Sequence, residues 1–130
     1  MLKVRCALLS EKASYKDCRR HILFKELSAE EKAELVKEQP AYGRVMCRCE
    51  TITEGEILAA LHSEVPATTI DGVKRRCGAG MGRCQGGFCG PRVLELISKT
   101  LGISPLDVLQ DKAGTNVLLC ETKQEENHHD

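Results

Sequence analysis

The stretch Arg83-Cys84-Gln85-Gly86-Gly87-Phe88-Cys89-Gly90-Pro91 places two cysteines five positions apart on a glycine-rich turn. Pro91 and the apolar residues that follow it indicate the start of a helix, because proline is favoured at the first helical position. A second pair of thiols lies upstream, in Cys47-Arg48-Cys49. The complete pattern is C-x-C, thirty-four residues, and C-x4-C. We interpret the four thiols as the ligands of one metal centre.

The spacing of these cysteines favours an iron–sulfur cluster over other uses of four thiols. Four thiolates hold a [2Fe-2S] or a [4Fe-4S] cluster, and we favour [2Fe-2S]. Structural zinc is the first alternative, although zinc sites more usually contain two pairs with two to four residues between the cysteines. A disulfide framework has the least weight, because nothing in the sequence marks secretion and reducing compartments keep thiols free.

The surroundings of the second pair suit a centre that carries negative charge. Reduction adds one negative charge to a [2Fe-2S] cluster, and nearby positive charge raises the reduction potential. The basic residues predicted to supply it are Lys74, Arg75, Arg76 and Arg83. Gly86 and Gly87 have no Cβ, so we expect backbone amides there to approach a sulfur closely.

The rest of the chain predicts a series of short helices. Two capping boxes, each a serine or threonine followed three residues later by glutamate, place helix starts at Ser28 and Thr53. Proline in a first turn and glycine after a last turn mark further helices. The helices expected are 29–38, 54–62, 69–76, 91–101 and 105–109. Residues 41–46 are expected to be extended, and 116–120 to form a short strand or a docking segment.

Composition limits both the fold and the function. The 130 residues include two Tyr, two Phe and no Trp, so the core is small and a metal would help to stabilise it. Nineteen basic and nineteen acidic residues argue against a nucleic-acid-binding protein. No apolar run reaches membrane-spanning length and no secretion signal is visible. We therefore expect a cytoplasmic protein that associates with a membrane, if at all, through a partner.

The four remaining cysteines receive separate interpretations. Cys6 and Cys18 are interpreted as free thiols, and Cys120, in an apolar run, as a small buried side chain. Cys77 lies seven residues before Cys84 and has no close partner, so we interpret it as a non-ligand. No residues are predicted to be catalytic: the lone histidines His21 and His62 are interpreted as surface groups, and His128 and His129 as part of a tail.

Several motifs, in this order, resemble the bacterioferritin-associated-ferredoxin-like [2Fe-2S] domain. They are Cys47-Arg48-Cys49-Glu50, Thr53-Glu54-Gly55-Glu56-Ile57, Asp71-Gly72-Val73-Lys74-Arg75-Arg76 and Gly80-Met81-Gly82-Arg83-Cys84-Gln85-Gly86-Gly87-Phe88-Cys89. The resemblance covers residues 40 to 111. It is strongest to the version at the C-terminus of FAD-dependent dehydrogenases of the anaerobic glycerol-3-phosphate dehydrogenase type.

This resemblance implies a mainly α, helix-turn-helix [2Fe-2S] domain of short helices with its cluster near the surface. It carries the ligand role onto Cys47, Cys49, Cys84 and Cys89. The implied divisions are an N-terminal segment with a linker helix (1–39), the cluster-binding domain (40–112) and a flexible tail (113–130). The implied function is to relay electrons from a FAD-dependent dehydrogenase, a partner domain or subunit that holds the FAD, to a further acceptor.

The sequence departs from the family in two respects. Cys77 stands where we expect a non-thiol residue such as threonine, and no G-x-G-x-x-G fingerprint of a flavin domain is present near the N-terminus. We therefore expect either an excised domain or a small separate protein, which does not catalyse substrate oxidation by itself. Two other functions stay open, a zinc-stabilised interaction module and a cluster-carrying partner in iron release.

Overall fold

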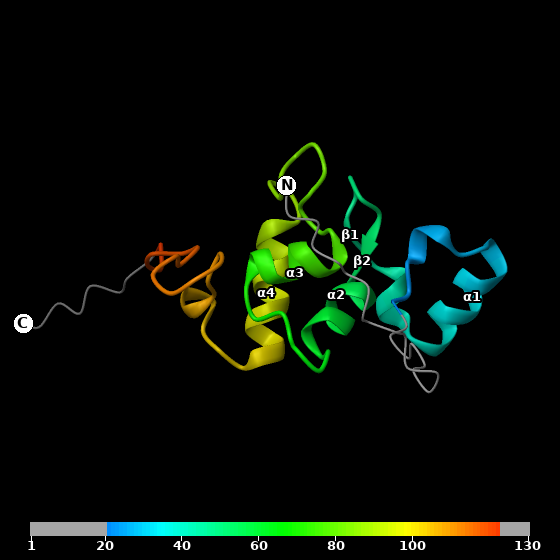
Figure 1. Ribbon diagram of the computed structural model, residues 1–130, viewed down its shortest axis with the longest axis horizontal. Coiled ribbons are helices and arrows are strands. Elements are labelled where there is room, and N and C mark those ends of the chain that lie inside the picture. The colour runs from blue at the N-terminus through cyan, green and yellow to red at the C-terminus, as the bar shows by residue number, and fades with distance from the viewer. Residues whose placement is uncertain (1–20, 123–130) are drawn as a thin grey trace, which may run out of the picture.

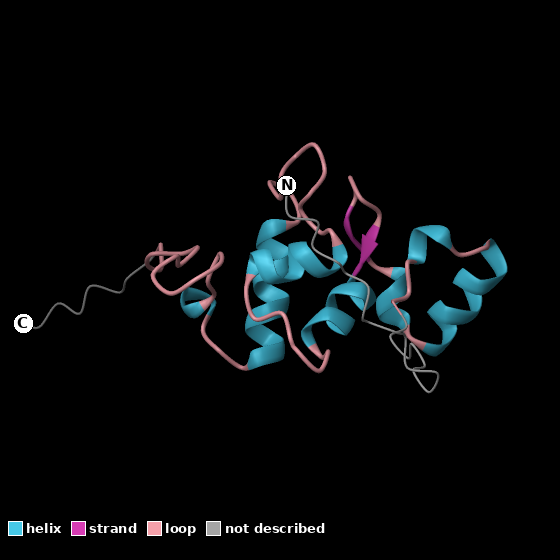
Figure 2. Ribbon diagram, in the orientation of Figure 1, coloured by secondary structure: helices cyan, strands magenta, loops and turns pink. Residues whose placement is uncertain are grey.

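The computed structural model describes residues 21–122 of the chain. It is mostly helical, with one small two-stranded sheet (Figures 1 and 2). The elements are η1 (Phe24–Glu26), α1 (Ala29–Glu38), η2 (Pro40–Gly43), β1 (Val45–Cys47), β2 (Ile52–Thr53), α2 (Glu54–Leu61), α3 (Ile70–Cys77), α4 (Gly90–Leu101) and η3 (Pro105–Asp107). The interpretations of Cys6, Cys18, His128 and His129 fall outside the described residues. No helix in the described part of the chain has the length and apolar character needed to cross a bilayer.

The predicted helix starts are confirmed by their hydrogen bonds. Both capping boxes are complete, with Ser28 and Thr53 each exchanging side-chain and backbone bonds with the glutamate three residues later. Thr69 caps α3 by accepting a bond from the backbone amide of Gly72. Helix α4 has proline in its first turn and ends at Gly102, whose φ of 65° is the left-handed conformation that glycine adopts at low cost.

Three expectations about the ends of the domain are wrong. Residues 41–43 lie in the 3-10 helix η2, whose Tyr42 side chain is buried, and the extended segment begins only at Val45. The helix expected over 105–109 is the single turn η3, because the carbonyl of Val108 accepts a bond from the amide of Val117. Of the two alternatives for 116–120, the short strand is reduced to one bridge between Leu109 and Asn116, and the docking segment stays a prediction.

The prediction that Cys120 is buried is also wrong. The apolar run that contains it does not pack into the core, and Cys120 is exposed. Leu119 beside it is 92% exposed. The apolar character of a short terminal segment therefore did not indicate burial.

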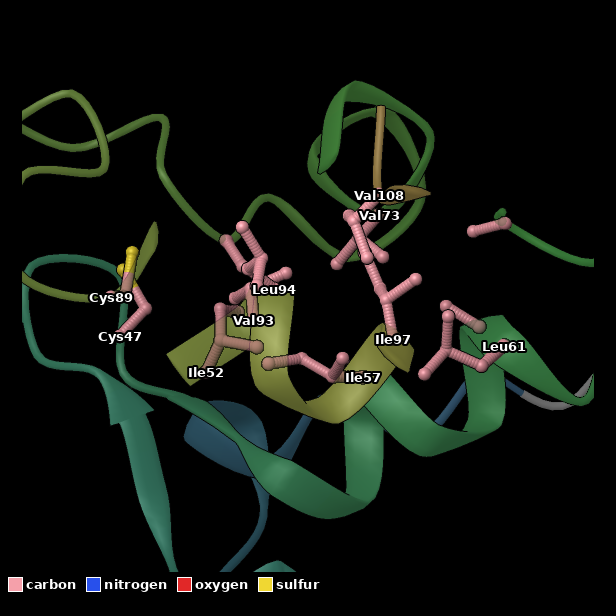
Figure 3. Packing of buried hydrophobic residues seen from close by; sticks show 13 residues of the cluster. Cys47, Ile52, Ile57, Leu61, Val73, Cys89, Val93, Leu94, Ile97 and Val108 are labelled. Atoms are coloured by element: carbon pink, nitrogen blue, oxygen red, sulfur yellow. The ribbon is translucent and has the colours of Figure 1, made fainter. Parts of the chain in front are cut away.

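The core lies between α2, α3 and α4. Its largest fully buried side chains include one from each helix, Ile57, Val73 and Ile97, and Val108 closes it from the segment after η3 (Figure 3). The antiparallel pair β1–β2 adds Ile52 and the first cysteine of the C-x-C motif to the same cluster. The helices thereby fix the position of the β1–β2 turn relative to the turn that precedes α4.

The N-terminal elements are attached to the start of α2. The amide of Phe24 donates to a carboxylate oxygen of Glu56 at 3.2 Å, and the guanidinium of Arg44 donates two bonds to the carboxylate of Glu54. The buried ring of Tyr42 lies directly against Gly55. Residues 24–44 therefore contact the domain at several points.

We expect Gly55→Ala to lower the free energy of unfolding by about 1–3 kcal/mol, the usual cost of overpacking a core. A Cβ at this position would lie 2.5 Å from the ring of Tyr42, which is itself buried. Chemical denaturation followed by circular dichroism measures the difference.

Gly90→Ala is the matched control, since a Cβ there meets no atom within 4 Å. We expect it to leave stability unchanged or slightly raised. Equal stability of the two variants would contradict the tight packing of Tyr42 on Gly55.

Candidate metal centre

Two turns bring four cysteines to one place. Cys47 ends β1 and Cys49 lies in the turn that follows, while Cys84 lies in the turn before α4 and Cys89 is the N-cap of that helix. Both turns project from the same side of the helices (Figure 1). Together they line a pocket of about 400 Å³, whose other lining residues are Met46, Arg48, Phe88 and Arg92.

The thiols are arranged as two pairs, each joining one turn to the other. The sulfurs of Cys49 and Cys84 are 3.6 Å apart. Cys47 and Cys89 are both buried and lie together at the edge of the core (Figure 3). Two sulfurs on one tetrahedral metal, with bonds of about 2.3 Å, are separated by about 3.8 Å. The spacing of Cys49 and Cys84 therefore fits two ligands of the same metal ion.

The pairs do not merge into a site for a single metal ion. Among residues 21–122, no group of three or more His, Cys, Asp or Glu side chains is arranged to hold one metal ion. A structural zinc would require four ligands around one point. Two separate pairs match the division of four thiolates between the two irons of a [2Fe-2S] cluster.

Backbone amides surround the outer sulfur of Cys84. The amide of Phe88 lowers the pKa of Cys84 most, followed by the thiol of Cys49 and the amides of Gly86 and Gly87. Gly86 has a φ of 86°, and Gln85 a φ of 49° that is uncommon outside glycine. These conformations direct successive N–H groups toward one sulfur, as expected for a site that stabilises negative charge.

The inner pair has the opposite environment. Burial first, and then the adjacent Cys47 thiol, raise the pKa of Cys89 to about 11. Cys47 and Cys89 are 1% and 2% exposed, whereas Cys49 is exposed. Binding of a metal replaces thiol protons, so Cys89, whose pKa is raised, holds its proton until a cation arrives.

A third turn, residues 78–82, supports the other two, a role that its glycines alone did not predict. A Cβ on Gly82 would lie 2.2 Å from Cys49 Cβ and 3.3 Å from its sulfur, so the backbone touches this cysteine. The side-chain amide of Gln85 donates to the carbonyls of Met81 and Gly82, at 3.1 and 2.9 Å. Glycine at position 82 was visible in the sequence, but its neighbour from another turn was not.

The basic residues predicted near the centre do not share one location. Arg75 forms ion pairs with Asp111 and Asp71, and Arg76 donates to the carbonyls of Val65 and Gly72. Lys74 lines a different, smaller cavity of about 100 Å³, to which Cys89 also contributes, and Arg83 is exposed.

Two arginines that the sequence analysis did not select, Arg48 and Arg92, line the cysteine pocket instead. Arg48 stands between the two cysteines of C-x-C, a position that could have identified it.

Cys77 is placed apart from the two pairs. It is the last residue of α3, and its thiol donates to the carbonyl of Val73 at 3.3 Å. Burial raises the pKa of Cys77, and the residue does not line the cysteine pocket. Its interpretation as a non-ligand stays a prediction, and the helix carbonyl gives its thiol another partner.

Comparison with known proteins gives a family for the central part of the chain. Residues 45–99 match the family model of the BFD-like [2Fe-2S] binding domain. A glycerol 3-phosphate dehydrogenase of Caloramator mitchellensis is 48% identical over 126 residues, which are 96% of this chain and 26% of that protein. No solved structure matches the chain.

Other relatives match smaller parts of the chain. An opine oxidase subunit of Rhizobium meliloti (strain 1021) is 43% identical over 65 residues, half of this chain and 14% of the relative. Hydrogen cyanide synthase subunit HcnB of Pseudomonas aeruginosa is 51% identical over 45 residues, 35% of this chain and 9% of the relative. The chain thus spans about a quarter or less of the length of these proteins.

We expect Gly82→Ala to reduce the iron bound per chain severalfold. The added methyl group would overlap Cys49 and force the two cysteine turns apart, and metal sites tolerate displacements of only about 0.5 Å. Iron analysis after anaerobic purification measures the loss. Gly78→Ala lies in the same supporting turn, with a φ of 81° but no atom within 4 Å of the added Cβ. It should strain the backbone yet retain iron, and equal loss in both variants would contradict the role of Gly82.

Proposed function

We propose that the domain at residues 45–99, which matches the BFD-like [2Fe-2S] binding domain, relays electrons from a FAD-dependent dehydrogenase to a further acceptor. Its family and its relatives among dehydrogenase and oxidase subunits support an electron-transfer role in an oxidoreductase. We assign the cluster ligands as Cys47, Cys49, Cys84 and Cys89. The observation that carries the proposal is the pairing of these thiols across two turns, with 3.6 Å between the outer sulfurs.

We assign the two thiol pairs different roles in holding the cluster. A bound [2Fe-2S] cluster would supply the chemistry, accepting and releasing one electron at a time. Cys47 and Cys89 anchor the centre to the hydrophobic core, where both side chains pack. Cys49 and Cys84 hold its outer side, where solvent and a partner have access. A redox centre with one side at the surface allows electrons to enter and leave.

The residues around the pocket are suited to a centre that becomes more negative on reduction. The amides of Phe88, Gly86 and Gly87 face the sulfur of Cys84. Arg48 and Arg92 add positive charge to the pocket lining. Hydrogen bonds to sulfur and nearby charge both set the reduction potential. These groups therefore favour the reduced form relative to a site without them.

The proposed electron source is a reduced flavin on a partner domain or subunit. The similar protein from Caloramator mitchellensis is a glycerol 3-phosphate dehydrogenase of which this chain covers 26%. Most of that relative's length therefore lies outside the similarity, and we assign substrate oxidation to that part. The present chain then transfers electrons without acting on the substrate itself.

We expect the anaerobically purified chain to be brown and to contain iron and acid-labile sulfide in equal amounts. Dithionite should bleach the visible absorption and produce the EPR signal of a reduced [2Fe-2S] cluster. Serine at any of the four ligand positions should remove most of the iron, because the hydroxyl is a poorer ligand than a thiolate.

Cys77→Ser is the control for these ligand variants. Its thiol donates to a helix carbonyl, a bond that a serine hydroxyl also forms, so the cluster content should match that of the unmodified chain. Loss of the cluster in this variant would overturn the ligand assignment. A colourless protein that holds zinc and no sulfide would reject the electron-transfer function.

A further inference from the structure

The aromatic side chain of Phe88 is exposed to solvent next to the cysteine pocket. The chain has only two phenylalanines, and this one is 85% exposed between the ligands Cys84 and Cys89. Its backbone amide faces the sulfur of Cys84. The site therefore requires an amide at position 88 but not an aromatic ring. The ring also stands outside the buried cluster that forms the core of the described domain.

Positive charge surrounds this exposed ring. Arg48 on the β1–β2 turn and Arg92 on the first turn of α4 both line the pocket, and both are exposed. Within residues 21–122 neither arginine forms an ion pair with another described residue. Among the described residues that line the pocket there is no Asp or Glu. We call the non-cysteine lining of this pocket, Met46, Arg48, Phe88 and Arg92, the rim.

The charge of the rim is local and is not a property of the whole chain. Basic and acidic residues are equal in number over the 130 residues. Two other arginines of the described domain are paired with carboxylates, Arg44 with Glu54 and Arg75 with Asp111. Because the whole chain has no net charge, arginines around one redox site give that site a local positive potential, which attracts acidic partners.

We propose that the rim is the docking surface for an acidic electron-exchange protein, whose own redox centre lies in an apolar patch bordered by carboxylates. This inference rests on the proposed electron-transfer function and adds the chemistry of the partner. Phe88 supplies an apolar anchor of the kind that is enriched at interface centres. Arg48 and Arg92 attract and orient the partner, one from each of the two cysteine-bearing turns.

A second copy of this chain is a poor occupant of the rim. In a symmetric dimer the same surface meets itself, so Arg48 and Arg92 would face arginines of the other copy. Like charges placed opposite each other oppose association. Charge complementarity therefore favours a different protein, one with acidic residues at its contact surface.

The test uses the complete 130-residue chain loaded with its cluster. The reduced protein is mixed by stopped flow with an acidic acceptor, a flavodoxin, or a basic acceptor, a cytochrome c, over a range of salt concentrations. We expect the rate with flavodoxin to fall as salt rises and the rate with cytochrome c to rise. The double variant R48E/R92E should lower the rate of electron transfer to flavodoxin by about tenfold or more at low salt. A tenfold change is the lower end of the range for electrostatic steering.

K25E/K37E is the matched charge control. It makes the same change in net charge, on exposed residues of η1 and α1. We expect it to change the flavodoxin rate far less than R48E/R92E. Phe88→Ala should slow the reaction at both high and low salt, and Phe88→Tyr should largely restore it, because the contact is apolar.

Three results would overturn the docking surface. Equal slowing by the two double variants would show only an effect of net charge. A rate with flavodoxin that rises with salt, together with a rate with cytochrome c that falls, would reverse the sign of the surface. Concentration-dependent dimerisation that R48E/R92E abolishes would show that the rim binds a second copy of this chain. In each case the visible and EPR spectra report separately on the cluster, so the electron-transfer proposal could stand while the docking surface fails.

Discussion

The contact between the two cysteine-bearing turns is the constraint on which this structure depends. Cys49 and Cys84 are 35 positions apart in sequence, yet their sulfurs are 3.6 Å apart. The helices α2, α3 and α4 create this proximity, because their packing fixes where β2 begins and where α4 starts. Gly82 then lies against Cys49, with no room for a side chain. A small change in helix packing would separate ligands that lie far from the core centre.

The metal centre and the hydrophobic core share residues. Cys47 and Cys89 belong to the same buried cluster as Ile57, Val93 and Ile97. A small domain with few aromatic residues gains stability from metal ligation, because the bonds to metal form only in the folded chain. Ligand substitutions at the inner pair therefore alter packing as well as metal binding, whereas those at the outer pair act mainly on the metal.

Much of this fold could be predicted because its helices are marked by local signals. Ser28 and Thr53 cap their helices through bonds that involve residues only three positions away. The end of the domain was harder, since the turn at η3 depends on Val117 pairing with Val108. Cys120 was misplaced for a related reason, because apolar character alone does not show whether the fold offers a place in the core.

The candidate metal centre was likewise predictable from the sequence only in part. The four cysteines were visible as spaced pairs, but their pairing across turns, Cys49 with Cys84 and Cys47 with Cys89, is a tertiary property. Nearness in sequence suggested Arg75 and Arg76 as neighbours of the centre. Their position on α3 instead directs them to Asp111 and to the carbonyl of Val65.

The bond from Phe24 to Glu56 bears on how such a domain would move within a larger protein. Glu56 also completes the cap of α2, so the chain at Phe24 is joined to the same helix start that follows the C-x-C turn. Residues 24–44 would consequently travel with the metal centre as one body. If electron delivery requires the domain to swing between a donor and an acceptor, residues 24–44 do not act as the hinge, and α1 moves together with the metal centre.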